Sequence, residues 1–214
     1  MAKFPNPGKV NKQFIPNFGE EDSSGFYSAF VKDLVANHSQ QQYRFTVYLQ
    51  PFDLGEQFLH RFGSVKLRPM SGVTQEDIYL NCFDETCALY DKVIIIQPFV
   101  PYLRVSDISE AFESLDMYDA VLGPTNSSSV YLIGLKRCSK IFKSAVLPPE
   151  KGFKALEKDI KAMNLSLAVS KTLQAIETIE DVIGLSKTLD QTLSPNTAGF
   201  ISELSEKYKS VFQS

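Results

Sequence analysis

The segment Asp116–Cys138 restricts the fold more than any other, because it contains two apolar runs separated by turn-forming residues. The runs are Ala120–Leu122 and Val130–Ile133, and Gly123–Asn126 and Ser127–Ser129 lie between them. Apolar and β-branched residues bounded by Gly, Pro, Asn and Ser predict two strands joined by a loop. Such loops carry the binding groups of many α/β proteins, although an ordinary hairpin connection is the simpler interpretation.

Apolar residues elsewhere alternate between strand and helix patterns. Val93–Ile96 is a continuous β-branched run, which is typical of a strand buried on both faces in a parallel sheet. Gly19–Asn37 and Ser106–Leu115 carry apolar residues at helical spacing, and Ser106 is a plausible N-cap of the second helix. The chain of 214 residues therefore suits one α/β domain, or one such domain with a short appendage.

Composition argues against several classes of protein. Hydrophobic residues make up 43% of the chain and charged residues 22%, and the net charge is -3, which gives no electrostatic footprint for nucleic acid. The sequence has no apolar run of 18 or more residues and no secretory signal, so we expect no membrane segment and a cytoplasmic location. The spacing of Cys82 and Cys87 is not that of a zinc site, and we expect all three cysteines to be free thiols.

The C-terminal part has a different character. The polar stretch Ser186–Thr197 contains Pro195 and is typical of a linker. Thr197–Phe212 places large apolar residues at helical spacing, which predicts an amphipathic helix that docks on its own domain or on a protein partner. We therefore expect a domain at 1–185 and a linker with a terminal helix at 186–214.

Three segments carry a family resemblance, and one of them is the helix in which Tyr27, Ala29, Phe30 and Asp33 match A-x-x-L-Y-x-A-F-L-x-D. Gly123, Pro124 and Tyr131–Leu135 match G-P-x-x-D-G-G-Y-Y-L-I-G-L, and the first ten residues match A-K-x-P-x-P-G-K-V. These patterns resemble the small nucleotide-diphospho-sugar transferase-like proteins of bacteria and archaea, the selenodomain-associated transferases. The D-G-G at the centre of G-P-x-x-D-G-G-Y-Y-L-I-G-L is replaced here by Ser127–Ser129.

The resemblance implies a fold and an activity. The implied fold is a GT-A-like three-layer sandwich, in which helices flank a mostly parallel mixed sheet. Members of the family are expected to transfer a nucleotidyl or glycosyl group from a nucleotide donor, with Mg²⁺ or Mn²⁺ bridging the phosphates. By this resemblance the nucleotide-binding residues are Lys3, Pro7, Gly8, Lys9 and Lys12.

The same resemblance marks positions where the metal chemistry has changed. The family carries G-S-D-x-P after the strand that matches Val93–Ile96, and its metal-binding Asp corresponds to Phe99, which cannot ligate a hard cation. Glu177 aligns with one acid of the family's D-V-D-T-P segment and is a candidate metal ligand. The positions expected in the cleft are Phe99, Ser127, Ser128, Ser129 and Tyr131.

Three functional hypotheses remain open from the sequence. The first is a degenerate relative that has lost most metal- and phosphate-binding residues and serves as a binding or interaction module. The second is an active transferase with relocated ligands, for which Asp84, Glu85, Asp119 and Glu177 are the candidate acids. The third is a metal-independent transferase that neutralises phosphates with Lys9, Lys12 and Arg137. The expected partner is a nucleotide or nucleotide sugar, a protein partner would bind the 197–212 helix, and no catalytic residue is assigned.

Overall fold

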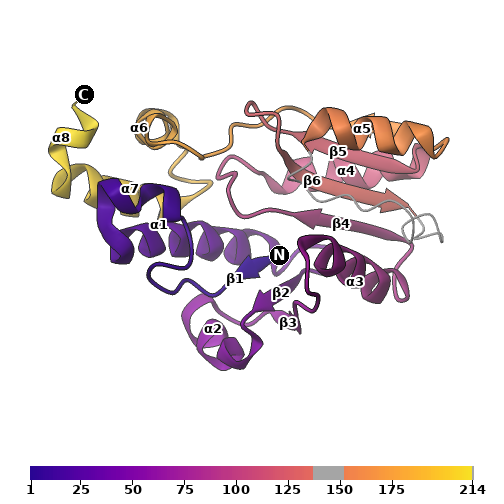
Figure 1. Ribbon diagram of the computed structural model, residues 1–214, viewed down its shortest axis with the longest axis horizontal. Helices are drawn as coiled ribbons and strands as arrows, with labels where there is room; N and C mark the ends of the chain where they lie inside the picture. Colours follow the sequence, from indigo (N-terminus) through magenta and orange to yellow (C-terminus); the bar gives the residue numbers. More distant parts are fainter. Residues whose placement is uncertain (137–151, 214) are drawn as a thin grey trace. The chain divides into compact units, whose positions relative to one another are not determined.

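The computed structural model describes residues 1–136 and 152–213 and has mixed α/β structure (Figure 1). Its residues group into two compact units, which we describe separately. The first unit comprises Met1, Pro69–Gln97 and Leu103–Gln174, and the second comprises Ala2–Arg68, Pro98–Tyr102 and Ala175–Ser214.

The first unit is built on a four-stranded sheet with the order β4-β6-β5-β7. β6 is antiparallel to β4 and to β5, whereas β7 is parallel to β5, so three of the four strands point in the same direction. Its elements are α3 (Gln75–Cys87), β4 (Lys92–Ile96), α4 (Val105–Met117), β5 (Ala120–Pro124), β6 (Val130–Lys136), α5 (Phe153–Ala162) and β7 (Leu167–Val169).

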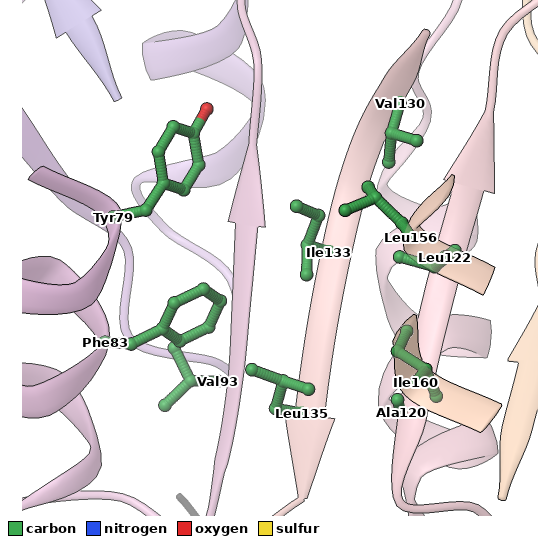
Figure 2. Packing of buried hydrophobic residues seen from close by; sticks show 10 residues of the cluster. All are labelled: Tyr79, Phe83, Val93, Ala120, Leu122, Val130, Ile133, Leu135, Leu156 and Ile160. Carbon is green, nitrogen blue, oxygen red and sulfur yellow. The ribbon is translucent and has the colours of Figure 1, made fainter. Parts of the chain in front are cut away.

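Helices cover both faces of this sheet. On one face, Tyr79 and Phe83 of α3 and Leu156 and Ile160 of α5 pack against strand residues such as Ile133 (Figure 2). On the other face, a Cβ atom at Gly134 of β6 would meet Leu115 Cδ1 of α4 at 3.3 Å. The unit is therefore a helix–sheet–helix sandwich, which confirms the predicted α/β class and its three layers.

The second unit contains a three-stranded sheet with the order β1-β2-β3, in which β1 and β2 are parallel. One apolar cluster joins this sheet to α1 and α2 through residues such as Val31, Leu49 and Phe58. The elements are β1 (Ala2–Lys3), the 3-10 helix η1 (Lys12–Phe14), α1 (Ile15–His38), β2 (Thr46–Gln50), the 3-10 helix η2 (Phe52–Leu54), α2 (Gly55–Phe62), β3 (Lys66–Pro69), α6 (Ile179–Thr188), α7 (Pro195–Lys207) and α8 (Lys209–Phe212).

The C-terminal helices pack on α1 inside the second unit. Ile201 and Leu204 of α7 are buried in a cluster with Phe26 and Phe30 of α1, so the apolar face of the predicted terminal helix is used within the chain. The helix begins at Pro195 rather than Thr197 and is followed by the short α8. The domain division at residue 185 and the protein partner stay predictions.

Several local predictions were wrong. β4 pairs with β6 in the antiparallel sense, and Ile94 to Ile96 are only half-buried, whereas a parallel strand buried on both faces was expected. Ser106 does not cap α4, because the helix begins at Val105 and its N-cap residue is Arg104. Cys82 is a buried thiol outside any disulfide, as expected, but Cys87 is disulfide-bonded. Across the described ranges, no helix is long and apolar enough to cross a membrane.

Candidate functional site

The carboxyl ends of β4, β5 and β7 meet at one edge of the first unit's sheet, because these three strands point the same way. We call this the carboxyl edge. It holds Gln97 after β4, the loop Thr125–Ser129 between β5 and β6, and Ser170–Lys171 after β7. Ligands of α/β proteins bind at such an edge, where loops present polar groups beyond the strand ends.

The loop Thr125–Ser129 presents a compact group of hydroxyls. Thr125 Oγ1 lies 2.9 Å from Ser127 Oγ and 2.7 Å from Ser129 Oγ, and the two serine oxygens are 3.1 Å apart. Ser128 has a φ of 69°, and its carbonyl accepts a 2.8 Å hydrogen bond from the N–H of Phe153, the first residue of α5. Two of the three predicted serines, Ser127 and Ser129, therefore form a hydroxyl cluster with Thr125, whereas Ser128 contributes its backbone to the turn.

Tyr131 supports this loop from inside the sheet. Its side chain is fully buried, and a Cβ atom at Gly123 would lie 2.5 Å from the ring carbon Cζ, so only glycine leaves room for the ring. The Tyr131 hydroxyl donates a 3.2 Å hydrogen bond to the carbonyl of Lys171. Burial raises the pKa of Tyr131, and the nearby carboxylates Asp107 and Glu110 raise it further, which keeps the phenol neutral.

An ion pair at the carboxyl edge was not predicted from the sequence. Asp107 Oδ1 lies 2.5 Å from Lys171 Nζ, and Asp107 Oδ2 accepts a 2.8 Å hydrogen bond from the N–H of Arg104 at the start of α4. The carboxylate side chain is 3% exposed and the lysine side chain 49%. The position of Asp107 in the first turn of a helix can be recognised from the sequence, but no sequence pattern connects this residue to Lys171.

The N-terminal loop belongs to the second unit and forms a tight turn. The carbonyl of Asn6 accepts a 3.1 Å hydrogen bond from the N–H of Lys9, and Gly8 has a φ of +71°. Pro7 followed by a glycine with positive φ is the sequence of a type II turn, which explains both residues without reference to a ligand. Lys9 is exposed on this turn, as are the side chains of Lys3 in β1 and Lys12 in η1.

Phe99 and Glu177 come from neighbouring segments of the second unit. The carbonyl of Phe99 accepts a 3.1 Å hydrogen bond from the N–H of Ile176, the residue before Glu177. Glu177 is exposed, and its N–H donates to Asp181, whose carboxylate also caps α6 through Thr178.

The other candidate acids of the active-transferase hypothesis lie away from the carboxyl edge. Asp119 directly precedes β5 and therefore lies at the opposite edge of the sheet. Its Oδ2 accepts hydrogen bonds from the N–H and the hydroxyl of Ser166. Asp84 and Glu85 are in the last turn of α3, which leads into the start of β4. Arg137 lies outside the described residues. Among the residues that the structure describes, no group of three or more His, Cys, Asp or Glu side chains could hold a metal ion.

Known proteins resemble this chain in structure. No protein-family model matches the sequence, and no curated protein matches it significantly. A crystal structure from Desulfovibrio desulfuricans G20, provisionally assigned as a nucleotide-diphospho-sugar transferase, superposes with a TM-score of 0.84 at 20% identity, covering 97% of this chain and 95% of that one. A cytidylyltransferase from Leptospira borgpetersenii serovar Hardjo-bovis (strain JB197) gives a TM-score of 0.52 at 13% identity, covering 88% and 85%. The chain therefore has the nucleotide-diphospho-sugar transferase-like fold that the sequence resemblance implied.

Proposed function

We propose that this protein binds a nucleotide or nucleotide sugar without a divalent metal and has lost metal-dependent group transfer. The observation that carries the proposal is the hydroxyl cluster of Thr125, Ser127 and Ser129. It stands at the carboxyl edge, in the place where the resembling family has an aspartate. Neutral hydroxyls donate hydrogen bonds to phosphate or sugar oxygens, but they are weak ligands for Mg²⁺ or Mn²⁺ without carboxylates beside them.

The remaining polar groups at the carboxyl edge do not fit a metal either. The Gln97 side-chain amide is hydrogen-bonded to the Tyr79 hydroxyl, so it is held within the first unit. The Asp107 carboxylate already pairs with Lys171 and accepts from the backbone of Arg104. Magnesium and manganese prefer several hard oxygen donors around one point, which this set does not offer.

The expected ligand class follows from the fold and from the basic N-terminal loop. Both structural neighbours are transferases, one provisionally assigned to nucleotide-diphospho-sugars and one a cytidylyltransferase. Lys9 and Lys12 are exposed in the second unit, and by the family resemblance they are the residues expected to contact phosphate oxygens. A shared fold does not by itself determine activity, so the proposal depends on a binding measurement.

Isothermal titration calorimetry with UDP, GDP and CTP, each with EDTA and with Mn²⁺, tests this proposal. We expect at least one nucleotide to bind in EDTA, with less than a threefold change in affinity when Mn²⁺ is added. The double variant Lys9→Ala/Lys12→Ala should weaken binding about tenfold, since each lost phosphate contact removes a charge-assisted interaction. The control Lys32→Ala/Lys209→Ala removes the same charge from exposed positions of α1 and α8 and should bind normally.

Two results would contradict the proposal. Binding that appears only with Mn²⁺ would indicate relocated metal ligands and favour an active transferase. Absence of binding under both conditions would exclude a nucleotide ligand of this kind.

A further inference from the structure

Lys171 is a charged residue at the carboxyl edge that the sequence resemblance does not account for. We propose that Lys171 is a resident cation that binds the diphosphate of the ligand, with Asp107 as its positioning residue. This inference rests on the proposed function, because it assigns a phosphate contact to the same edge of the sheet.

Backbone hydrogen bonds place the main chain around Lys171 next to the end of β5, which leads into the hydroxyl cluster. The N–H of Ser170 donates 2.9 Å to the carbonyl of Leu122, and the N–H of Leu173 donates 3.1 Å to the carbonyl of Pro124. The N–H of Asn126 in turn donates 3.1 Å to the carbonyl of Leu173. The chain after β7 therefore continues alongside the end of β5. Lys171 lies between Ser170 and Leu173, the two residues whose N–H groups make these hydrogen bonds, next to the start of the loop Thr125–Ser129.

Asp107 holds the lysine side chain in place. The Asp107 carboxylate is 3% exposed and accepts a hydrogen bond from the N–H of Arg104. The Lys171 side chain is 49% exposed, and its ammonium nitrogen lies 2.5 Å from Asp107 Oδ1. An ammonium group has three donors, and this contact uses one of them. A buried carboxylate paired with a surface lysine adds little net stability, because desolvation of the charge offsets the attraction. Its effect at this position is to orient the ammonium group of a side chain that is half exposed and therefore accessible to a ligand.

A diphosphate suits this arrangement better than a single carboxylate. Lysine is a compact, strongly hydrated point charge that binds phosphate oxygens from many directions. Thr125, Ser127 and Ser129 add neutral hydroxyl donors at the same edge, and a diphosphate offers enough oxygens to use both kinds of donor. The ammonium charge would then provide the neutralisation that a divalent cation provides in metal-dependent phosphoryl chemistry.

The test uses the full chain in EDTA and compares Lys171→Ala, Lys171→Arg and the control Lys136→Ala. Lys136 is an exposed lysine at the far end of β6, at the opposite edge of the same sheet. The probes are inorganic pyrophosphate and the nucleotide that the wild-type protein binds. We expect Lys171→Ala to weaken both at least tenfold, Lys171→Arg to stay within threefold of the wild type, and Lys136→Ala to bind normally.

Lys171→Ala leaves the buried Asp107 charge without its partner and could therefore unfold the protein. A second variant separates loss of binding from loss of folding. Lys171→Ala/Asp107→Asn removes both charges and keeps an amide oxygen for the N–H of Arg104, and it should fold and still bind at least tenfold more weakly. If the wild type binds nucleotide and both Lys171→Ala variants bind equally well, the lysine has no phosphate contact and only this inference fails. If the wild type binds neither probe, the proposed function fails together with it.

Discussion

Replacing the buried Asp33 by alanine should destabilise the protein more than replacing an exposed acid does. Asp33 is a buried carboxylate in α1 whose two oxygens accept four hydrogen bonds from the first turn of α7. Oδ1 accepts from the N–H and the side-chain amide of Asn196 at 3.0 and 2.7 Å. Oδ2 accepts from the N–H and the hydroxyl of Thr197 at 2.8 and 2.6 Å. One side chain therefore caps α7 and attaches it to α1.

The magnitude follows from what the substitution leaves behind. Thr197 is fully buried, so Asp33→Ala would leave two donors without water or a protein partner, at a cost of about 1–3 kcal/mol each. The donors of Asn196 are only partly buried and regain hydration. Removing a buried charge offsets part of the loss, and we expect a net destabilisation of about 4 kcal/mol. For a chain of this size that corresponds to a melting temperature about 10 °C lower.

Urea unfolding followed by circular dichroism measures this free energy. Asp190→Ala is a chemically matched control, because Asp190 Oδ1 also accepts from the N–H and hydroxyl of a threonine, Thr192, but on the exposed surface. The control should lose less than about 1 kcal/mol. A loss below about 1 kcal/mol for Asp33→Ala would refute the reasoning, since it would mean that the buried donors of Thr197 find other partners.

Three further predictions concern Gly123 and Asp119 in the first unit and Gly199 in the second. Gly123→Ala should lower stability by about 2–3 kcal/mol, because its Cβ would lie 2.5 Å from the buried Tyr131 ring. Gly199 lies inside α7, and an added Cβ would meet nothing within 4 Å. Gly199→Ala should therefore raise stability by about 0.5–1 kcal/mol, and thermal unfolding of the two variants checks both values. Hydrogen bonds from the side chain and backbone of Ser166 hold the pKa of Asp119 below its usual range, so its stabilising contribution is present above about pH 4 and is lost as the pH falls through the lowered pKa. Asp119→Asn should therefore reduce the difference in urea midpoint between pH 7 and pH 3, and an unchanged difference would contradict this assignment.

The strands and helices of this chain were predictable where the local pattern is strong. Ala120–Leu122 and Val130–Ile133 lie in β5 and β6 as expected, and Val93–Ile96 lies in β4. The pairing of β4 was not predictable, because a β-branched run shows that a strand is apolar but not which strand lies beside it. α1 shows a related limit: the structure extends it to Ile15 across Gly19, whose φ of 75° interrupts the helical backbone.

The candidate site was predictable only in part, for a physical reason. The serines of the loop are adjacent in sequence, so their clustering follows from local turn geometry. Asp107 is in the first turn of α4 and Lys171 follows β7, so their contact exists only in the folded unit, where α4 packs on the sheet that contains β7. A single sequence contains no periodicity that reports such a contact.

In the β5–β6 segment, the glycines and the tyrosine that match the family pattern are packing residues. Gly123 leaves room for the Tyr131 ring, and a Cβ at Gly134 would lie 2.4 Å from Val121 Cγ1. Replacing these glycines costs stability whatever the protein binds, so they are constrained by the sheet itself. Ser127, by contrast, is exposed in the loop, where a change from acid to hydroxyl alters chemistry but little packing. The motif therefore reports the architecture of the β5–β6 hairpin, and the function has to be inferred from the hydroxyls and the lysine at its edge.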